Sequence, residues 1–120
     1  MSKSELKIKS FSSDEVFRRW LDRNHAKSPG IWLKIQKKSS KRKFISYDEA
    51  LETLLCFGWI DSQRKSFDEE SFLQKITPRQ KKSPWSERNA LIVKRLIKEG
   101  RMCPSGLEAV KEAKSDGRWP

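Results

Sequence analysis

One carboxylate stands inside an apolar stretch, where Asp61 ends the run Leu-Cys-Phe-Gly-Trp-Ile-Asp at positions 55–61. A buried charge without a partner is costly, so a cation or a hydrogen-bond donor is expected beside it. Arg64 and Arg79 are the nearest candidates. A bidentate Asp61–Arg79 contact would lower the pKa of the carboxyl group and could form the polar floor of a pocket. The same contact could instead be a structural ion pair that holds a hairpin against a helix.

Strand alternation predicts which of these side chains share a face. Asp61 and Gln63 are expected on one face of a strand and Arg64 on the other. Arg79 follows the next strand and would reach the Asp61 face. The pocket would bind a small anionic ligand or a peptide end, and its candidate residues are Trp59, Asp61, Arg64, Arg79, Ser83, Trp85 and Asn89.

The segment from Thr77 to Ser86 combines basic residues with hydroxyl groups. Ser83 followed by Pro84 fits the N-cap and the first position of a helix. The free N–H groups at a helix N-terminus favour phosphate or carboxylate. This segment therefore predicts either an anion site or an ordinary helix cap.

The cysteines Cys56 and Cys103 and the single histidine His25 are the other reactive groups. A cysteine nucleophile needs a lowered pKa and a base. Cys56 is expected at the C-terminal end of a helix, where the dipole disfavours a thiolate. We expect a buried thiol, an exposed His25, no catalytic residue, no metal site and no cofactor. An enzyme of unknown reaction stays open as a further alternative.

Basic residues dominate the charge, with 27 Lys and Arg against 16 Asp and Glu and a net charge of +11 over 120 residues. The length indicates a single domain, 1–120. A basic surface attracts nucleic acid, which gives an alternative function for the clusters 34–43 and 75–82 if they are more than solvated loops. Its candidate contacts are Lys37, Lys38, Lys41, Arg42, Lys43, Lys81 and Lys82.

The N-terminus is polar, and no segment approaches the roughly 18 apolar residues that a membrane span needs. These features predict a cytoplasmic protein without membrane insertion. Nothing in the sequence indicates its oligomeric state.

The first half of the chain alternates between strand and helix patterns. Residues 6–10 suggest a short edge strand. A capping box of Ser12 and Glu15 would open a helix over 13–24, and residues 31–36 read as an amphipathic strand.

A second capping box, Ser46 with Glu49, opens the next helix, and Gly58 fits the C′ position that ends it. Residues 59–67 and 72–77 read as the two strands of a hairpin.

Two further helices should begin at Ser83-Pro84 and Cys103-Pro104 and end near Gly100 and Gly117. The pattern predicts an α+β fold, with a small antiparallel sheet of three to four strands packed against about four helices.

The chain also resembles a known family. The segments that carry the likeness are Ser46-Tyr47-Asp48-Glu49-Ala50, the run 55–61, Phe72, Thr77-Pro78-Arg79, Ser83, Trp85-Ser86, Asn89, Gly100-Arg101-Met102 and Asp116-Gly117-Arg118-Trp119. They resemble the YdeI/OmpD-associated family, also called the bacteriocin-protection family, whose members usually continue beyond the position of Pro120. The resemblance implies a cytoplasmic bacterial protein linked to stress and to antimicrobial-peptide resistance. It implies no established catalytic mechanism, cofactor or functional residue.

Overall fold

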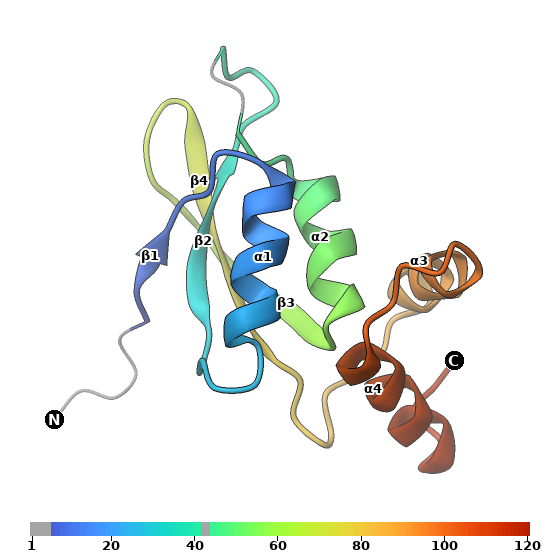
Figure 1. Cartoon of the computed structure of the whole chain (residues 1–120). Helices are drawn as coiled ribbons and strands as arrows, with labels where there is room; N and C mark the ends of the chain where they lie inside the picture. The colour runs from blue at the N-terminus through green and yellow to red at the C-terminus, as the bar shows by residue number, and fades with distance from the viewer. Residues whose placement is uncertain (1–5, 42–43) are drawn as a thin grey trace, which may run out of the picture.

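The structure is a computed structural model that describes residues 6–41 and 44–120, in which four strands and four helices form an α+β fold (Figure 1). The class predicted from the sequence is therefore confirmed. The elements are β1 (Ile8–Lys9), α1 (Asp14–Asn24), β2 (Ile31–Gln36), α2 (Tyr47–Cys56), β3 (Trp59–Ser66), β4 (Ser71–Pro78), α3 (Glu87–Lys98) and α4 (Pro104–Ser115).

The strands lie in the order β1-β2-β4-β3. The predicted hairpin is formed, because β3 pairs with β4 in antiparallel register, and β4 pairs antiparallel with β2. The expectation of a purely antiparallel sheet is corrected at one edge, where β1 pairs parallel with β2. The cause is α1, which carries the chain back across the sheet between these two strands so that both run in the same direction.

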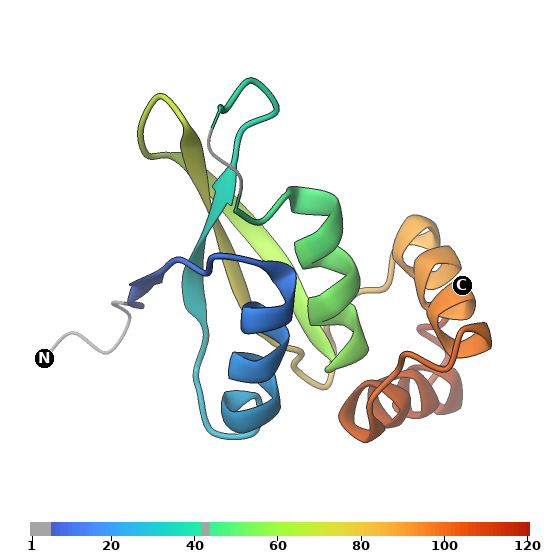
Figure 2. The same ribbon diagram turned by 45° about the horizontal axis from the view of Figure 1, so that its top comes forward.

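Helices α1 and α2 cover one face of the sheet, and α3 and α4 lie beyond α2 (Figures 1 and 2). The core lies between the sheet and helices α1 and α2. Ile31, Leu33 and Ile35 on β2 are each at most 2% exposed, and they pack with Phe17 and Leu21 of α1. Burial of each such side chain contributes about 1.5–3 kcal/mol to stability.

The other face of the sheet carries Trp32, as the alternation of β2 predicts. Lys65 of β3 places its Nζ 4.2 Å from the Trp32 ring centroid, and Lys34 of β2 places its Nζ 5.2 Å from that of Phe67. Both lysines pair with Leu73 of the intervening strand β4, so their side chains extend across it towards the aromatic rings. Leu73 is 1% exposed although no helix covers it, because aliphatic lysine stems shield apolar surface while the charged ends stay in water.

Helix α2 begins and ends as its sequence predicts. Ser46 accepts a hydrogen bond from the backbone N–H of Glu49, and the Glu49 side chain accepts one from the backbone of Ser46. Gly58 has a φ of +80°, which suits the left-handed C′ position after the last turn. For α1 the predicted cap is wrong by one residue, because Ser13 rather than Ser12 accepts from the N–H of Val16.

Helix α3 begins later than predicted. Its N-cap is Ser86, which accepts a hydrogen bond from the Asn89 N–H at 3.0 Å. The Ser83 hydroxyl instead accepts from the N–H of Gln80 at 2.8 Å, within a turn that precedes the helix. No helix N-terminus stands at Ser83, so the predicted helix cap is wrong there, and the alternative anion site loses the helix end on which it was based. Trp85 consequently lies in the connection before α3.

A close approach of backbones holds α4 against the end of α2. A Cβ atom added to Gly106 would lie 2.2 Å from the carbonyl oxygen of Cys56. That oxygen accepts a hydrogen bond from the N–H of Cys103, and the Ser105 hydroxyl donates to the carbonyl of Phe57 at 2.9 Å. Helix α4 thereby lies over the start of β3, where the apolar run 55–61 turns from helix into strand.

Candidate functional site

A β-bulge determines where the polar residues of β3 point. Asp61 pairs with Ile76, whereas Arg64 pairs with Gln74, so β3 uses one residue more than β4 between these two pairs. Asp61 and Arg64 therefore lie on the same, helix-covered face, and the predicted opposition of these side chains is wrong. Simple alternation fails because the inserted residue shifts the period of the strand.

The side chain of Gln74 holds this bulge in place. Gln74 is 3% exposed, and its amide nitrogen donates to the carbonyl oxygens of Ser62 at 3.4 Å and Gln63 at 3.0 Å. Its amide oxygen accepts from the Nε of Arg64 at 3.1 Å. One buried amide thus satisfies the irregular backbone and also orients an arginine.

Replacing Gln74 by leucine is expected to lower the free energy of unfolding by about 1–3 kcal/mol, because buried hydrogen bonds are lost and polar groups are left without partners. Urea denaturation measures this change. The amide signals of Ser62 and Gln63 should shift in NMR spectra, while those of β1 should not. Equal stability of the variant and the native protein would contradict the role assigned to Gln74.

Asp61 has a different partner from the one predicted. Its carboxylate accepts a hydrogen bond from the hydroxyl of Tyr47 at 2.8 Å, and Arg79 does not form an ion pair with it. The reason is position, since Tyr47 begins α2 above Asp61 while Arg79 lies beyond the last pair of the β3–β4 ladder, Trp59 with Pro78. Burial and the bond to Asp61 raise the pKa of Tyr47.

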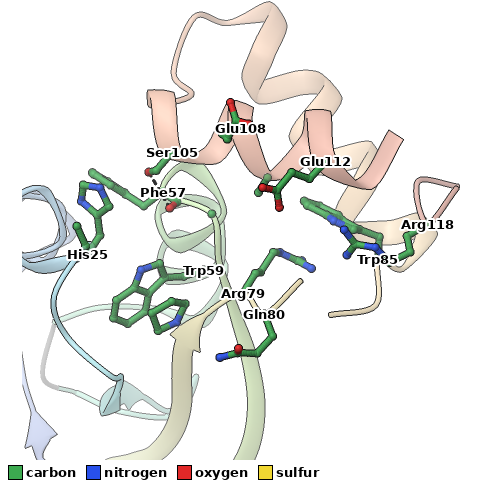
Figure 3. A pocket seen from close by; sticks show the side chains of 14 residues that line it. His25, Phe57, Trp59, Arg79, Gln80, Trp85, Ser105, Glu108, Glu112 and Arg118 are labelled. Atoms are coloured by element: carbon green, nitrogen blue, oxygen red, sulfur yellow. Dashed lines mark hydrogen bonds between the residues drawn. The ribbon is translucent and has the colours of Figure 1, made fainter. Parts of the chain in front are cut away.

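Three of the predicted pocket residues do converge, and they line a cavity of about 340 Å³ between the end of β4, the connection to α3, and α4 (Figure 3). These residues are Trp59, Arg79 and Trp85. In Figure 3 the Arg79 side chain extends towards Trp85, and Glu112 approaches from α4. Gln80 adjoins Arg79, and side chains from distant parts of the chain complete the lining, among them His25, Glu108, Glu112 and Arg118.

Arg79 is the central cation of this cavity. Its Cζ lies 3.6 Å from the ring centroid of Trp85, and its Nη1 donates to the carbonyl of Pro84 at 2.9 Å. Its Nε and Nη2 are buried, and neither has a hydrogen-bond partner among the described residues. Burial and the neighbouring charge of Arg118 lower the pKa of Arg79 to about 10. The guanidinium is thus protonated at neutral pH, and Asp61, whose charge acts on its pKa in the opposite direction, forms no ion pair with it.

The two tryptophans present further donors without acceptors. Trp59 is 1% exposed and Trp85 is 8% exposed, and the indole N–H of each is buried without a partner in the described part of the chain. Buried polar groups in folded proteins are nearly always hydrogen-bonded. These four N–H positions, on three residues that line one cavity, have no acceptor among the described residues.

The rim of the cavity contains residues that the sequence did not single out. His25 is half-buried rather than exposed, because its ring packs on Phe57 with a centroid distance of 5.3 Å. Its Nδ1 lies 2.9 Å from the carbonyl of Leu21, which can only accept, so Nδ1 carries the proton in this contact. Arg118 reaches the cavity because Asp116 binds its Nε at 2.8 Å. Only the long-range fold brings these residues together.

The remaining predicted pocket residues lie elsewhere. The carbonyl of Ser83 accepts from Arg118 at 2.7 Å, and Asn89 lies in the first turn of α3, so neither side chain lines the cavity. Asp61 and Arg64 belong to the bulge, and Arg64 lines a second cleft beside α2. Of the seven predicted residues, three therefore line the cavity, two lie at the bulge, and Ser83 and Asn89 belong to neither place.

The described candidate contacts of the two basic clusters lie towards opposite ends of β4. Gln36, just before the first cluster, pairs with Ser71 at the start of β4, whereas Lys81 and Lys82 follow its end at Pro78. The eight residues of this extended strand separate its two ends by about 23 Å. Lys37, Lys38 and Lys41 are described, and Arg42 and Lys43 lie outside the described residues. Among the described candidate contacts, Lys37, Lys38 and Lys41 therefore lie apart from Lys81 and Lys82.

The cysteines are not activated. Cys56 is fully buried, and burial raises the pKa of its thiol as well as that of Cys103. Within residues 6–41 and 44–120, no group of three His, Cys, Asp or Glu side chains could hold a metal ion. None of the helices in that part of the chain is long and apolar enough to cross a membrane.

The fold and the site define a small α+β domain with a solvent-open cavity lined by residues rich in hydrogen-bond donors. Residues 9–109 match the family described as Domain of unknown function (DUF8412), so the chain belongs to this family. Comparison with curated proteins gave no match, and comparison with solved structures gave none.

Proposed function

We propose that this protein is a non-catalytic binding module whose cavity holds the anionic group of a small ligand or of a peptide end. The observation that carries the proposal is the set of four buried, unpartnered N–H groups on Trp59, Arg79 and Trp85. An anionic oxygen is the strongest acceptor for such donors, and charge-assisted hydrogen bonds are about twice as strong as neutral ones.

The charges around the cavity favour a carboxylate over a phosphate. Two arginines, Arg79 and Arg118, line it together with two glutamates, Glu108 and Glu112. The glutamates are one turn apart on α4 and form an acidic wall that opposes a ligand with a double negative charge. A single carboxylate, such as the C-terminus of a peptide, satisfies the donors with less repulsion. A positively charged group on the same ligand would be attracted to the wall.

Recognition of a carboxylate by the cavity can be tested by NMR with a short alanine peptide that has a free C-terminal carboxylate. The chain has five tryptophans and hence five indole N–H signals. Binding is expected to shift the signals of Trp59 and Trp85 downfield, because these protons gain an acceptor, and to leave that of Trp32 on the far face unchanged. The same peptide with an amidated C-terminus is the control. Equal binding of the two peptides would contradict recognition of a carboxylate.

Arg79→Met is expected to weaken binding of this peptide at least about tenfold, because the charged donor is lost while much of the packing on Trp85 is retained. Isothermal titration calorimetry measures the affinity. Arg95→Met is the matched control, since Arg95 lies on α3, pairs with Glu52 and does not line the cavity. Undiminished affinity in a folded Arg79→Met variant would refute the proposed site.

The cellular role is a further part of the proposal. The resemblance to the YdeI/OmpD-associated family supports a role in stress and in resistance to antimicrobial peptides. A cavity for a peptide end is consistent with such a role, because an antimicrobial peptide offers a terminal carboxylate on a positively charged chain.

A further inference from the structure

A second cleft, separate from the cavity of Arg79, lies between the N-terminus of α2 and the bulged strand β3. Its volume is about 460 Å³, and it shares no lining residue with the first cavity. The residues that line it are Gln36, Lys37, Lys38, Ser46, Tyr47, Asp48, Arg64, Phe72 and Arg88.

Positive charge is concentrated in this cleft. Four cations line it, namely Lys37, Lys38, Arg64 and Arg88, against the single carboxylate of Asp48. The ion pairs found among the described residues involve Arg95, Arg101 and Arg118, and none of them includes a cation of the cleft. The nearby carboxylate of Asp61 accepts from Tyr47. The cleft therefore has an excess of positive charge that the described side chains do not neutralise through ion pairs.

Arg64 is held ready for a ligand. Its Cζ lies 4.1 Å from the ring centroid of Phe72 and 5.1 Å from that of Tyr47, and its Nε donates to Gln74. These contacts restrict the side chain and leave its two Nη groups to bind an oxyanion in the forked geometry of guanidinium. The bulge is the cause of this placement, since regular alternation would turn Arg64 to the other face of the sheet.

The aromatic rings favour a ligand that also has a planar part. Phe72 and Tyr47 flank Arg64, and the Cζ of Arg88 lies 6.0 Å from the centroid of Tyr47. Nucleic-acid bases stack on aromatic rings and on guanidinium planes.

We propose that this cleft binds a nucleotide unit, with its phosphate at Arg64, Arg88 and the lysines and its base stacked against the arginine–aromatic cluster. The unit could be a free nucleotide or part of a single strand, because both offer the same phosphate and base. This site is independent of the carboxylate cavity and involves different residues.

The test uses the full chain and three probes: inorganic phosphate, adenosine monophosphate and a short single-stranded oligothymidylate. Calorimetry is expected to show tighter binding of the nucleotide than of phosphate. If the oligothymidylate binds more tightly than adenosine monophosphate and its affinity falls steeply as the salt concentration rises, the bound nucleotide unit is part of a single-stranded nucleic acid. Equal affinity for phosphate and for adenosine monophosphate would contradict the proposed stacking of the base. Absence of binding by both nucleotide probes would refute the proposed nucleotide site.

Arg64→Gln and Arg88→Gln are each expected to weaken nucleotide binding about tenfold, because each removes a charged donor. The two arginines come from different elements, so Arg88→Gln tests the site even if Arg64→Gln disturbs the bulge. Arg95→Gln controls for general loss of charge. Arg79→Met should bind nucleotide like the native protein, which separates this site from the carboxylate cavity. Native affinity in both folded variants, Arg64→Gln and Arg88→Gln, would overturn the proposal.

Discussion

Replacing Gly106 by alanine is expected to lower the free energy of unfolding by about 3 kcal/mol, near the upper end of the usual cost of overpacking. The new Cβ would lie 2.2 Å from the carbonyl oxygen of Cys56 and 2.8 Å from its carbon. Both are backbone atoms, so relief of the clash requires α4 to move away from α2. Such a movement would also disturb the Ser105–Phe57 hydrogen bond at the edge of the cavity.

The sign of this effect distinguishes it from an ordinary change in helix propensity. Gly106 lies inside α4, where alanine normally stabilises a helix by about 0.5–1 kcal/mol. Urea denaturation would measure the loss, and Gly100→Ala is the control because a Cβ there meets nothing within 4 Å. That control should cost only about 1 kcal/mol, owing to its φ of +71°. A Gly106→Ala variant as stable as the native protein would show that the helices are not in such close contact.

Trp59→Ala is expected to cost about 3–5 kcal/mol of stability. Trp59 is among the largest fully buried side chains, and its ring meets that of Trp20 edge to face at a centroid distance of 6.0 Å. Truncation would remove this packing and enlarge the cavity that it lines. Thermal or urea denaturation would detect the change, and a loss below 1 kcal/mol would contradict the central position assigned to the indole.

Trp59→Phe separates the packing role of this residue from its role as a donor. Phenylalanine retains much of the apolar volume and removes the unpartnered N–H. Stability should therefore fall far less than in the alanine variant, because the buried donor imposes no penalty once it is removed. Binding of the carboxylate peptide should nevertheless weaken, since one of the four donors is missing.

Local sequence signals accounted for most of the elements, because capping boxes and hydrophobic periodicity act within a few residues. The Ser46–Glu49 box and Gly58 defined α2 correctly for this reason. The N-cap signal failed where two nearby residues could each begin the same helix. Ser83 and Ser86 are both good N-caps, and burial of Trp85 against Arg79 and Trp119 accompanies the later start.

The candidate site was only partly predictable, because its parts come together through the tertiary fold. Trp59, Arg79 and Trp85 were found from their types and their positions at the ends of elements. His25 and Arg118 reach the cavity from opposite ends of the chain, and no local spacing indicates this. The bulge was also hidden, since it depends on the register that Gln74 imposes from the neighbouring strand.

The bulge that orients Arg64 also has a consequence for self-association. In the described part of the sheet, β3 is an edge strand, and β1 at the other edge is only two residues long. A regular edge strand offers a ladder of unpaired backbone groups to another chain, and natural proteins counter this with bulges, charges and short strands. Here the irregular backbone at Ser62 and Gln63 is followed directly by Arg64 and Lys65. The same local device thus presents an arginine to the cleft and protects the sheet from edge-to-edge aggregation.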